Sequence, residues 1–154
     1  MSEQLVSIEA LAGEVRLYLF REAAATAQIP QAPEIGRALA QPESAVRMAL
    51  HALAASKVLI LAPNNGHIWA ANPFCAVPSG FRVHAGGKRY WGICIWDALG
   101  IAAALGTDAV ITAPCGDCGA AMALEVRGAQ LVRSDGVVHF AVPAHHWWDN
   151  IGFT

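Results

Sequence analysis

The segment at residues 81–126 reads FRVHAGGKRYWGICIWDALGIAAALGTDAVITAPCGDCGAAMALEV. Its apolar residues recur at helical spacing from about Ile93 to Leu105, and Gly106 follows as a stop signal, which predicts one helix. Short β-rich runs separated by glycine-containing turns predict strands at residues 81–84, 108–113 and 121–126. A further strand is expected at 137–142, followed by a turn or one short helix at 143–150. This order indicates a small, mainly antiparallel sheet with one crossing helix.

The residues before this segment have a different pattern. Ala/Leu-rich helical spacing predicts a helix over residues 10–27, and prolines and glutamates mark the starts of two further helices ending near residues 39 and 56. Two strands, at 58–61 and 67–70, are separated by the turn sequence PNNG. Three helices followed by a hairpin is the order of a winged helix-turn-helix. We therefore expect an α+β protein with a winged-helix-like domain at residues 1–72 and a second domain at 73–154.

The charge of the first 72 residues tests whether this winged helix binds DNA. They contain five Lys or Arg and six Glu, a net charge of −1. Phosphate neutralisation supplies most non-specific DNA affinity, so a DNA-reading domain is expected to be clearly basic. Nucleic acid is thus not an expected partner, and a role as scaffold or interface is favoured. A winged-helix regulator that responds to metal stays open as an alternative.

The composition bounds the class of protein. Of 154 residues, 55% are hydrophobic and 14% are charged, which argues against disorder. The apolar excess favours a deep core, an apolar pocket or a homodimer interface. No apolar run reaches the roughly 18–20 residues that a membrane span needs, and no signal peptide is recognisable, which predicts a cytoplasmic protein. In a reducing compartment, cysteines favour metal binding or thiol chemistry over disulfides; the four here are Cys75, Cys94, Cys115 and Cys118.

A C-x-x-D motif opens the predicted second-domain helix. Residues three apart lie on one helix face, so the Cys94 thiol and the Asp97 carboxyl are expected side by side. The positive end of the helix dipole favours the thiolate, and Asp97 has the chemistry to carry a proton to or from a group bound at sulfur. The alternative is a buried Cys94 acting as a small hydrophobic residue, with Asp97 capping the helix or exposed to solvent.

A C-x-x-C-G motif, residues 115–119, lies in the turn between two predicted strands. It resembles half of a zinc knuckle, but a structural zinc site has four ligands. No second C-x-x-C exists, so Cys75, Cys94 or a histidine is needed to complete such a site. A redox dithiol and two incidental turn cysteines are the other interpretations of Cys115 and Cys118.

Several motifs together resemble the organomercurial (alkylmercury) lyase family. They are FRV at 81–83, YWGICIWDALG at 90–100, LGTDAV at 105–110, APCGDCG at 113–119 and HFAVPAHHWWDNIGFT at 139–154. The resemblance covers the chain from about Phe81 onward, and the winged-helix order before it is also found in this family.

The resemblance implies protonolysis of a carbon–mercury bond. Cys94 is the expected thiolate ligand of mercury, a soft metal, and Asp97 is the expected proton relay to the departing carbon. Ile93, Trp91 and Trp96 are the expected apolar lining for the organic group.

The resemblance also bears on ligands and partners. No cofactor is required, and small-molecule thiols are the expected acceptors of the product. In family members a second catalytic cysteine follows the segment matching residues 151–154, and Cys115 and Cys118 are the candidates for its role here. A non-catalytic relative that binds mercury, copper or zinc through Cys94, Cys115 and Cys118 is the alternative.

Overall fold

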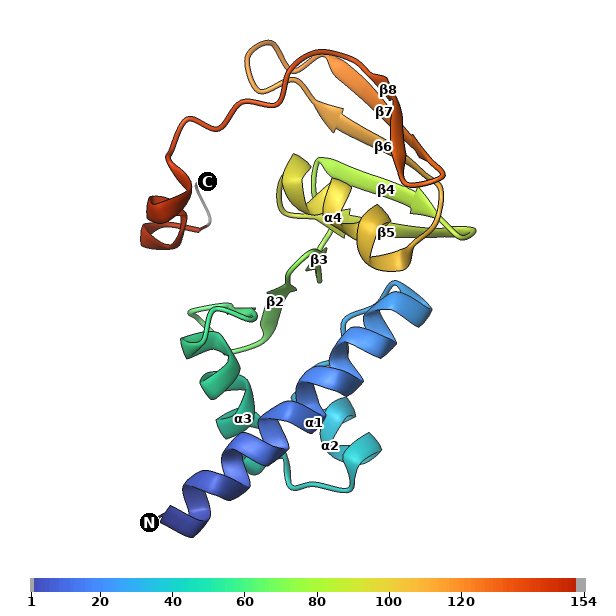
Figure 1. Cartoon of the computed structure of the whole chain (residues 1–154). Helices are drawn as coiled ribbons and strands as arrows, with labels where there is room; N and C mark the ends of the chain where they lie inside the picture. The colour runs from blue at the N-terminus through green and yellow to red at the C-terminus, as the bar shows by residue number, and fades with distance from the viewer. Residues whose placement is uncertain (1, 152–154) are drawn as a thin grey trace.

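The computed structural model describes the backbone of residues 2–151 and the side chains of residues 8–151. Figure 1 shows a helical N-terminal half and a sheet-containing C-terminal half, and the expected α+β class is confirmed. The helices are α1 (Ser2–Thr26), α2 (Ala32–Leu39), α3 (Glu43–Ala55), α4 (Ile95–Leu105) and the 3₁₀ helix η1 (Ala144–Asp149). The strands are β1 (Ile60–Leu61), β2 (Ile68–Ala71), β3 (Phe74–Cys75), β4 (Phe81–Ala85), β5 (Lys88–Gly92), β6 (Ala109–Pro114), β7 (Ala121–Arg127) and β8 (Gln130–Ser134).

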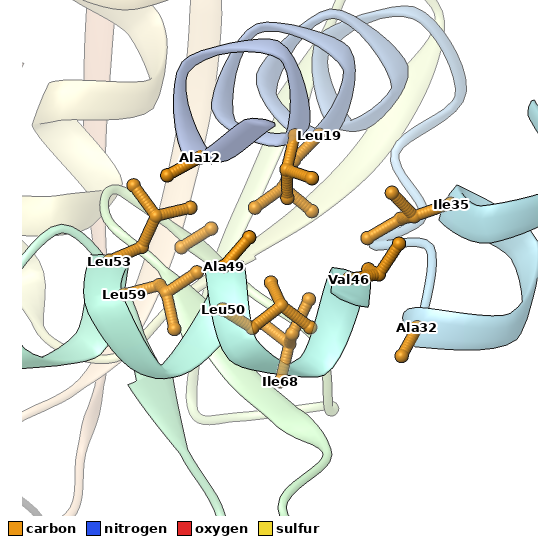
Figure 2. Close-up of a cluster of buried hydrophobic side chains, with 12 residues drawn as sticks. Ala12, Leu19, Ala32, Ile35, Val46, Ala49, Leu50, Leu53, Leu59 and Ile68 are labelled. Atoms are coloured by element: carbon orange, nitrogen blue, oxygen red, sulfur yellow. The ribbon is translucent and has the colours of Figure 1, made fainter. Parts of the chain in front are cut away.

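The first three helices enclose one hydrophobic core, shown in Figure 2. Helix α3 buries one face through residues spaced three or four apart, as an amphipathic helix does: Val46, Ala49, Leu50 and Leu53. Leu19 of α1 and Ile35 of α2 meet this face and are fully buried. The three predicted helices are thus confirmed, with α1 beginning earlier than the expected residue 10.

Gln31 joins the start of α2 to the first sheet. Its backbone N–H donates to the Glu34 carboxylate at 2.7 Å, which satisfies a donor that the helix leaves free. Its side-chain amide exchanges two hydrogen bonds with the backbone of Ile68, at 2.8 and 3.2 Å. A residue in the predicted helix break is therefore also the link between a helix and a strand.

The first sheet is antiparallel with the order β1-β2-β3. The predicted hairpin is present, but its strands are shorter or shifted by a residue, and β3 is a further strand that was not predicted. The winged-helix description and the boundary at residue 72 stay predictions. A second hydrophobic core, in the C-terminal half, also takes Ala23 from the end of α1, and Phe20 and Ile29 contact both cores.

The second sheet is antiparallel throughout, with the order β5-β4-β6-β7-β8. Helix α4 crosses between β5 and β6 in sequence and packs on the sheet through Ala98, Ile101 and Ala102. It ends at Gly106, whose φ of 59° gives the left-handed cap that the sequence predicts. The crossing helix and the antiparallel sheet are as expected.

Two predictions about the strands are wrong. Residues 137–142, expected as a strand, form none; the edge position beside β7 belongs to β8 instead. Gly128 and Ala129 both have positive φ, the geometry of a tight two-residue hairpin turn, so the chain reverses directly from β7 into β8. Gly86 and Gly87 make the same kind of turn, which creates β5 at residues 88–92, where no strand was predicted.

Candidate active site

Cys94 and Asp97 lie together at the start of α4. Cys94 is the residue that caps the helix, with an extended backbone, and Asp97 is in the first turn. The Cys94 Sγ lies 3.7 Å from the Asp97 Oδ2, within hydrogen-bonding distance for sulfur. The structure therefore brings together the thiol and the carboxyl that the C-x-x-D spacing places on one face.

Gly92 allows the helix start to approach the end of β5 this closely. A Cβ at this position would stand 2.8 Å from the Ala98 backbone nitrogen and 3.1 Å from the Asp97 Cβ. Both distances are shorter than ordinary contacts. The lack of a side chain at Gly92 is thus part of how the sequence positions the pair.

The pair opens into a cavity of about 250 Å³ between α4 and the C-terminal segment. Its lining residues are Asn72, Ile93, Cys94, Trp96, Asp97, Phe140, Trp147, Trp148 and Ile151. Ile93 and Trp96 line it as the sequence predicts. Trp91 does not: it lies on β5 and stacks under the Arg82 guanidinium, with 5.8 Å between the guanidinium carbon and the ring centre.

Aromatic rings join the C-terminal segment to α4 across this cavity. The Phe140 ring lies edge-on to Trp96, with 6.4 Å between centroids, and 4.9 Å from Trp147. The Trp147 indole N–H donates to the Val142 carbonyl at 2.7 Å, which fixes the start of η1. Such ring pairs prefer tilted or edge-to-face arrangements and so orient one another. One side of the cavity is therefore a wall of aromatic rings.

Burial changes the protonation of both polar groups. It raises the pKa of Asp97, and hydrogen bonds from the Cys94 thiol and the backbone act in the opposite direction. It also raises the pKa of the Cys94 thiol, although backbone hydrogen bonds at Asp97 and Trp96 oppose this. The expectation that the helix start lowers the Cys94 pKa is thus wrong, because loss of water outweighs the favourable amide groups.

Cys115 and Cys118 lie in the turn between β6 and β7 and do not line the Cys94 cavity. Cys115 faces a different cavity, of about 360 Å³, and Cys118 is exposed. Among the described side chains, those of residues 8–151, no three His, Cys, Asp or Glu are grouped so as to hold one metal ion. A shared site of Cys94, Cys115 and Cys118 is therefore not present in the described structure.

The family model for alkylmercury lyase, MerB, matches residues 74–154, a range that contains both thiol motifs and the aromatic wall. This chain belongs to the alkylmercury lyase family. It also resembles the solved structure titled "Crystal structure of the mercury-bound form of MerB2", with a TM-score of 0.57 and 17% identity. That match covers 82% of this chain and 66% of the solved chain, just under two thirds of its length. No curated protein matches this chain.

Sequence reasoning about the alkylmercury lyase motifs missed most of the cavity wall. Phe140, Trp147 and Trp148 are recognisable as aromatic residues, but nothing in their spacing shows that they face α4. Asn72 comes from yet another part of the chain.

Cys75 is buried in β3, with its Sγ 3.7 Å from the Trp69 carbonyl oxygen, and burial raises the pKa of its thiol.

The part of the chain that the structure describes contains no helix long and apolar enough to cross a membrane.

Proposed function

We propose that this chain cleaves the carbon–mercury bond of a small organomercurial by protonolysis, with Cys94 as the mercury ligand and Asp97 as the proton relay. The observation that carries the proposal is the 3.7 Å contact of the two groups inside an aromatic-walled cavity. Family membership supports the reaction class, and the likeness to the solved mercury-bound protein supports the fold.

Capture of the substrate begins with one proton shared by the pair. The raised pKa of Cys94 favours the protonated thiol at rest, and the neighbouring Asp97 carboxylate is the base that can accept its proton. As the sulfur–mercury bond forms, the proton moves from Sγ to the carboxylate, and the anionic ligand opposite the carbon, such as acetate or a small thiolate, leaves the mercury. Thiolate is the ligand that a soft metal prefers, so this bond compensates for the lost S–H bond.

Cleavage returns the proton to the substrate. Protonated Asp97 donates to the carbon bound to mercury; the carbon–mercury bonding pair becomes the new C–H bond, and the hydrocarbon leaves. Mercury stays on the Cys94 sulfur as a cationic centre. The raised pKa of Asp97 suits this step, because the carboxyl holds its proton to a higher pH than an ordinary aspartate does and so serves better as a general acid.

A second thiolate is needed to stabilise and remove the mercury. Cys115 and Cys118 are the candidates within the sequence, but they lie outside the lining of the Cys94 cavity. We therefore assign this role to a small-molecule thiol from solution. Such thiols are kept reduced in the cytoplasm, which agrees with the expected localisation.

The N-terminal half serves in this proposal as a winged-helix-like scaffold, residues 1–72, for the lyase part at 73–154. The Tyr90 hydroxyl in β5 donates to the Ala24 carbonyl at the end of α1, at 2.7 Å. The net charge of −1 of residues 1–72 gives no support to DNA binding by this half. The contact between α1 and the second sheet holds β5, and with it the start of α4, in place.

The test is hydrocarbon release. Phenylmercuric acetate is incubated with excess small thiol and the whole chain, the Cys94→Ser variant or the Cys75→Ser variant, and benzene is measured by gas chromatography. We expect release by the parent chain and by Cys75→Ser, and none by Cys94→Ser. Release by Cys94→Ser contradicts the assigned ligand. Mercury retained on the parent chain without benzene instead supports the non-catalytic, metal-binding alternative.

A further inference from the structure

The turn between β6 and β7 carries two thiols that the proposed lyase reaction does not use. We propose that Cys115 and Cys118 together bind one soft closed-shell metal ion, of the type of mercuric or cuprous ion, through two thiolates. This site is separate from the Cys94 cavity and does not depend on carbon–mercury cleavage.

The backbone of the turn holds the two cysteines on one short loop. Strands β6 and β7 remain paired up to Pro114 and Ala121. The Cys115 N–H donates to the Ala120 carbonyl at 2.8 Å, and the Gly119 N–H donates to the Cys115 carbonyl at 2.9 Å. In Figure 1 this loop projects from the end of the β6–β7 hairpin. Metal capture at this point therefore requires no rearrangement of the sheet.

The loop also presents hydrogen-bond donors to the Cys115 sulfur. The Cys115 sulfur accepts hydrogen bonds from the backbone N–H groups of Cys118 and Asp117 and from the Cys118 thiol. The two sulfur atoms therefore lie within hydrogen-bonding distance of each other on the loop. Thiolate sulfur is the donor that a soft metal prefers.

The surroundings of the pair favour an ion that accepts two ligands. Cys115 lines the 360 Å³ cavity beside apolar side chains such as Ile95, Met122 and Leu124, whereas Cys118 is exposed to solvent. A structural zinc ion takes four ligands. In the described part of the chain, no third His, Cys, Asp or Glu is grouped with this pair for a metal. Two thiolates are the natural donor set for a soft ion with low coordination number.

Binding is a ligand exchange with no change in oxidation state. Two sulfur–metal bonds form, each thiol that is still protonated releases its proton to water, and the ion loses the ligands with which it arrived. No oxidant or reductant takes part. Because both sulfurs belong to one loop, the second bond forms intramolecularly, which increases affinity by about 10²–10⁴ over a single thiol.

The experiment uses the whole chain with Cys94→Ser, so that the cavity thiol does not contribute. Mercuric chloride is added with an excess of small monothiol, and the metal bound per chain is measured by equilibrium dialysis and native mass spectrometry. We expect one retained ion. Adding Cys115→Ser or Cys118→Ser is expected to weaken binding by about 10²–10⁴-fold, whereas adding Cys75→Ser, the matched control, leaves it unchanged.

Two results overturn the proposal. One is equal binding by the Cys115→Ser, Cys118→Ser and Cys75→Ser variants in the Cys94→Ser background. The other is a Cys115–Cys118 disulfide that persists in the excess monothiol, detected as a mass two hydrogens lower than the reduced chain. Benzene release is not measured in these variants, so failure of this site and failure of the lyase reaction are distinguished.

Discussion

Asp97→Asn removes both proton transfers assigned to Asp97 but keeps the Cys94 sulfur that binds mercury, so the thiol proton is released to solvent instead. The amide has nearly the shape of the carboxyl, so the 3.7 Å contact with Cys94 is preserved while the transferable proton is lost. A positioned general acid contributes typically about 10²–10⁴-fold in rate, which corresponds to about 2.7–5.5 kcal/mol of barrier. We expect benzene release to fall by that factor while mercury remains bound at Cys94, measured in a single turnover with enzyme in excess.

Asp97→Asn is also expected to stabilise the fold at neutral pH, whereas a disruptive mutation destabilises it. The pKa of Asp97 is raised in the folded chain, so the folded state binds this proton more tightly than the unfolded state does. Stability is therefore lost as pH rises from the ordinary Asp range through the raised pKa. Asp97→Asn removes this loss and is expected to raise the melting temperature at neutral pH. The control is Asp108→Asn, outside the cavity lining. Benzene release by Asp97→Asn at the parent rate refutes the relay.

Three further predictions follow from other contacts. Gly92→Ala places a methyl group 2.8 Å from a backbone nitrogen of α4, so we expect a loss of about 1–3 kcal/mol in unfolding free energy together with loss of benzene release. Tyr90→Phe leaves the Ala24 carbonyl at the end of α1 without its hydroxyl donor and is expected to cost about 1–3 kcal/mol in urea unfolding. Benzene release is expected to give a bell-shaped pH profile: the acid limb is Asp97 protonation and the alkaline limb Cys94 deprotonation, both above the ordinary range because both pKa values are raised.

Matched variants show whether these effects are specific. Gly13→Ala adds a methyl group to α1 where no atom lies within 4 Å, so it is expected to be neutral or stabilising. Tyr18→Phe removes a hydroxyl from a side chain that packs partly buried against the first core. Equal losses in the two glycine variants, or in the two tyrosine variants, contradict the respective argument. Benzene release that stays constant as the pH falls, with no acid limb, contradicts the role of Asp97 as acceptor of the thiol proton.

The helices were predictable because their signals are local. Pro33 and Glu34 near the start of α2, and Gly106 at the end of α4, act within one turn of the helix that they begin or end. The strands were less predictable, since β5 and β8 depend on hairpin turns whose backbone geometry the amino-acid sequence only partly indicates. Ala129 adopts a positive φ beside Gly128, a conformation that alanine rarely takes. Because β6 and β8 already pair with the two edges of β7, residues 137–142 have no edge of β7 left to pair with.

The candidate site divides in the same way. The sequence predicted the contact between Cys94 and Asp97, but for a different local reason: Cys94 is the extended capping residue before α4, and Asp97 is the third residue of the helix. The aromatic wall could not be predicted, because Trp96 and Phe140 are separated by three strands and two hairpin turns that fold back between them. The cavity is therefore a product of the tertiary fold, although its reactive pair is a product of one helical turn.

This division explains why the expected pKa of Cys94 had the wrong direction. Amide groups at the start of α4 do favour the thiolate, as the local sequence implies, but burial of the Cys94 thiol in the tertiary fold outweighs them, and the nearby Asp97 acts in the same direction as burial. Cys115, in a hairpin turn, has backbone donors and the Cys118 thiol beside it, and its pKa is lowered. The two cysteines thus have opposite pKa shifts because their tertiary surroundings and neighbouring side chains differ. Opening the wall, for example by truncating Phe140, is therefore expected to make Cys94 more acidic and more like Cys115.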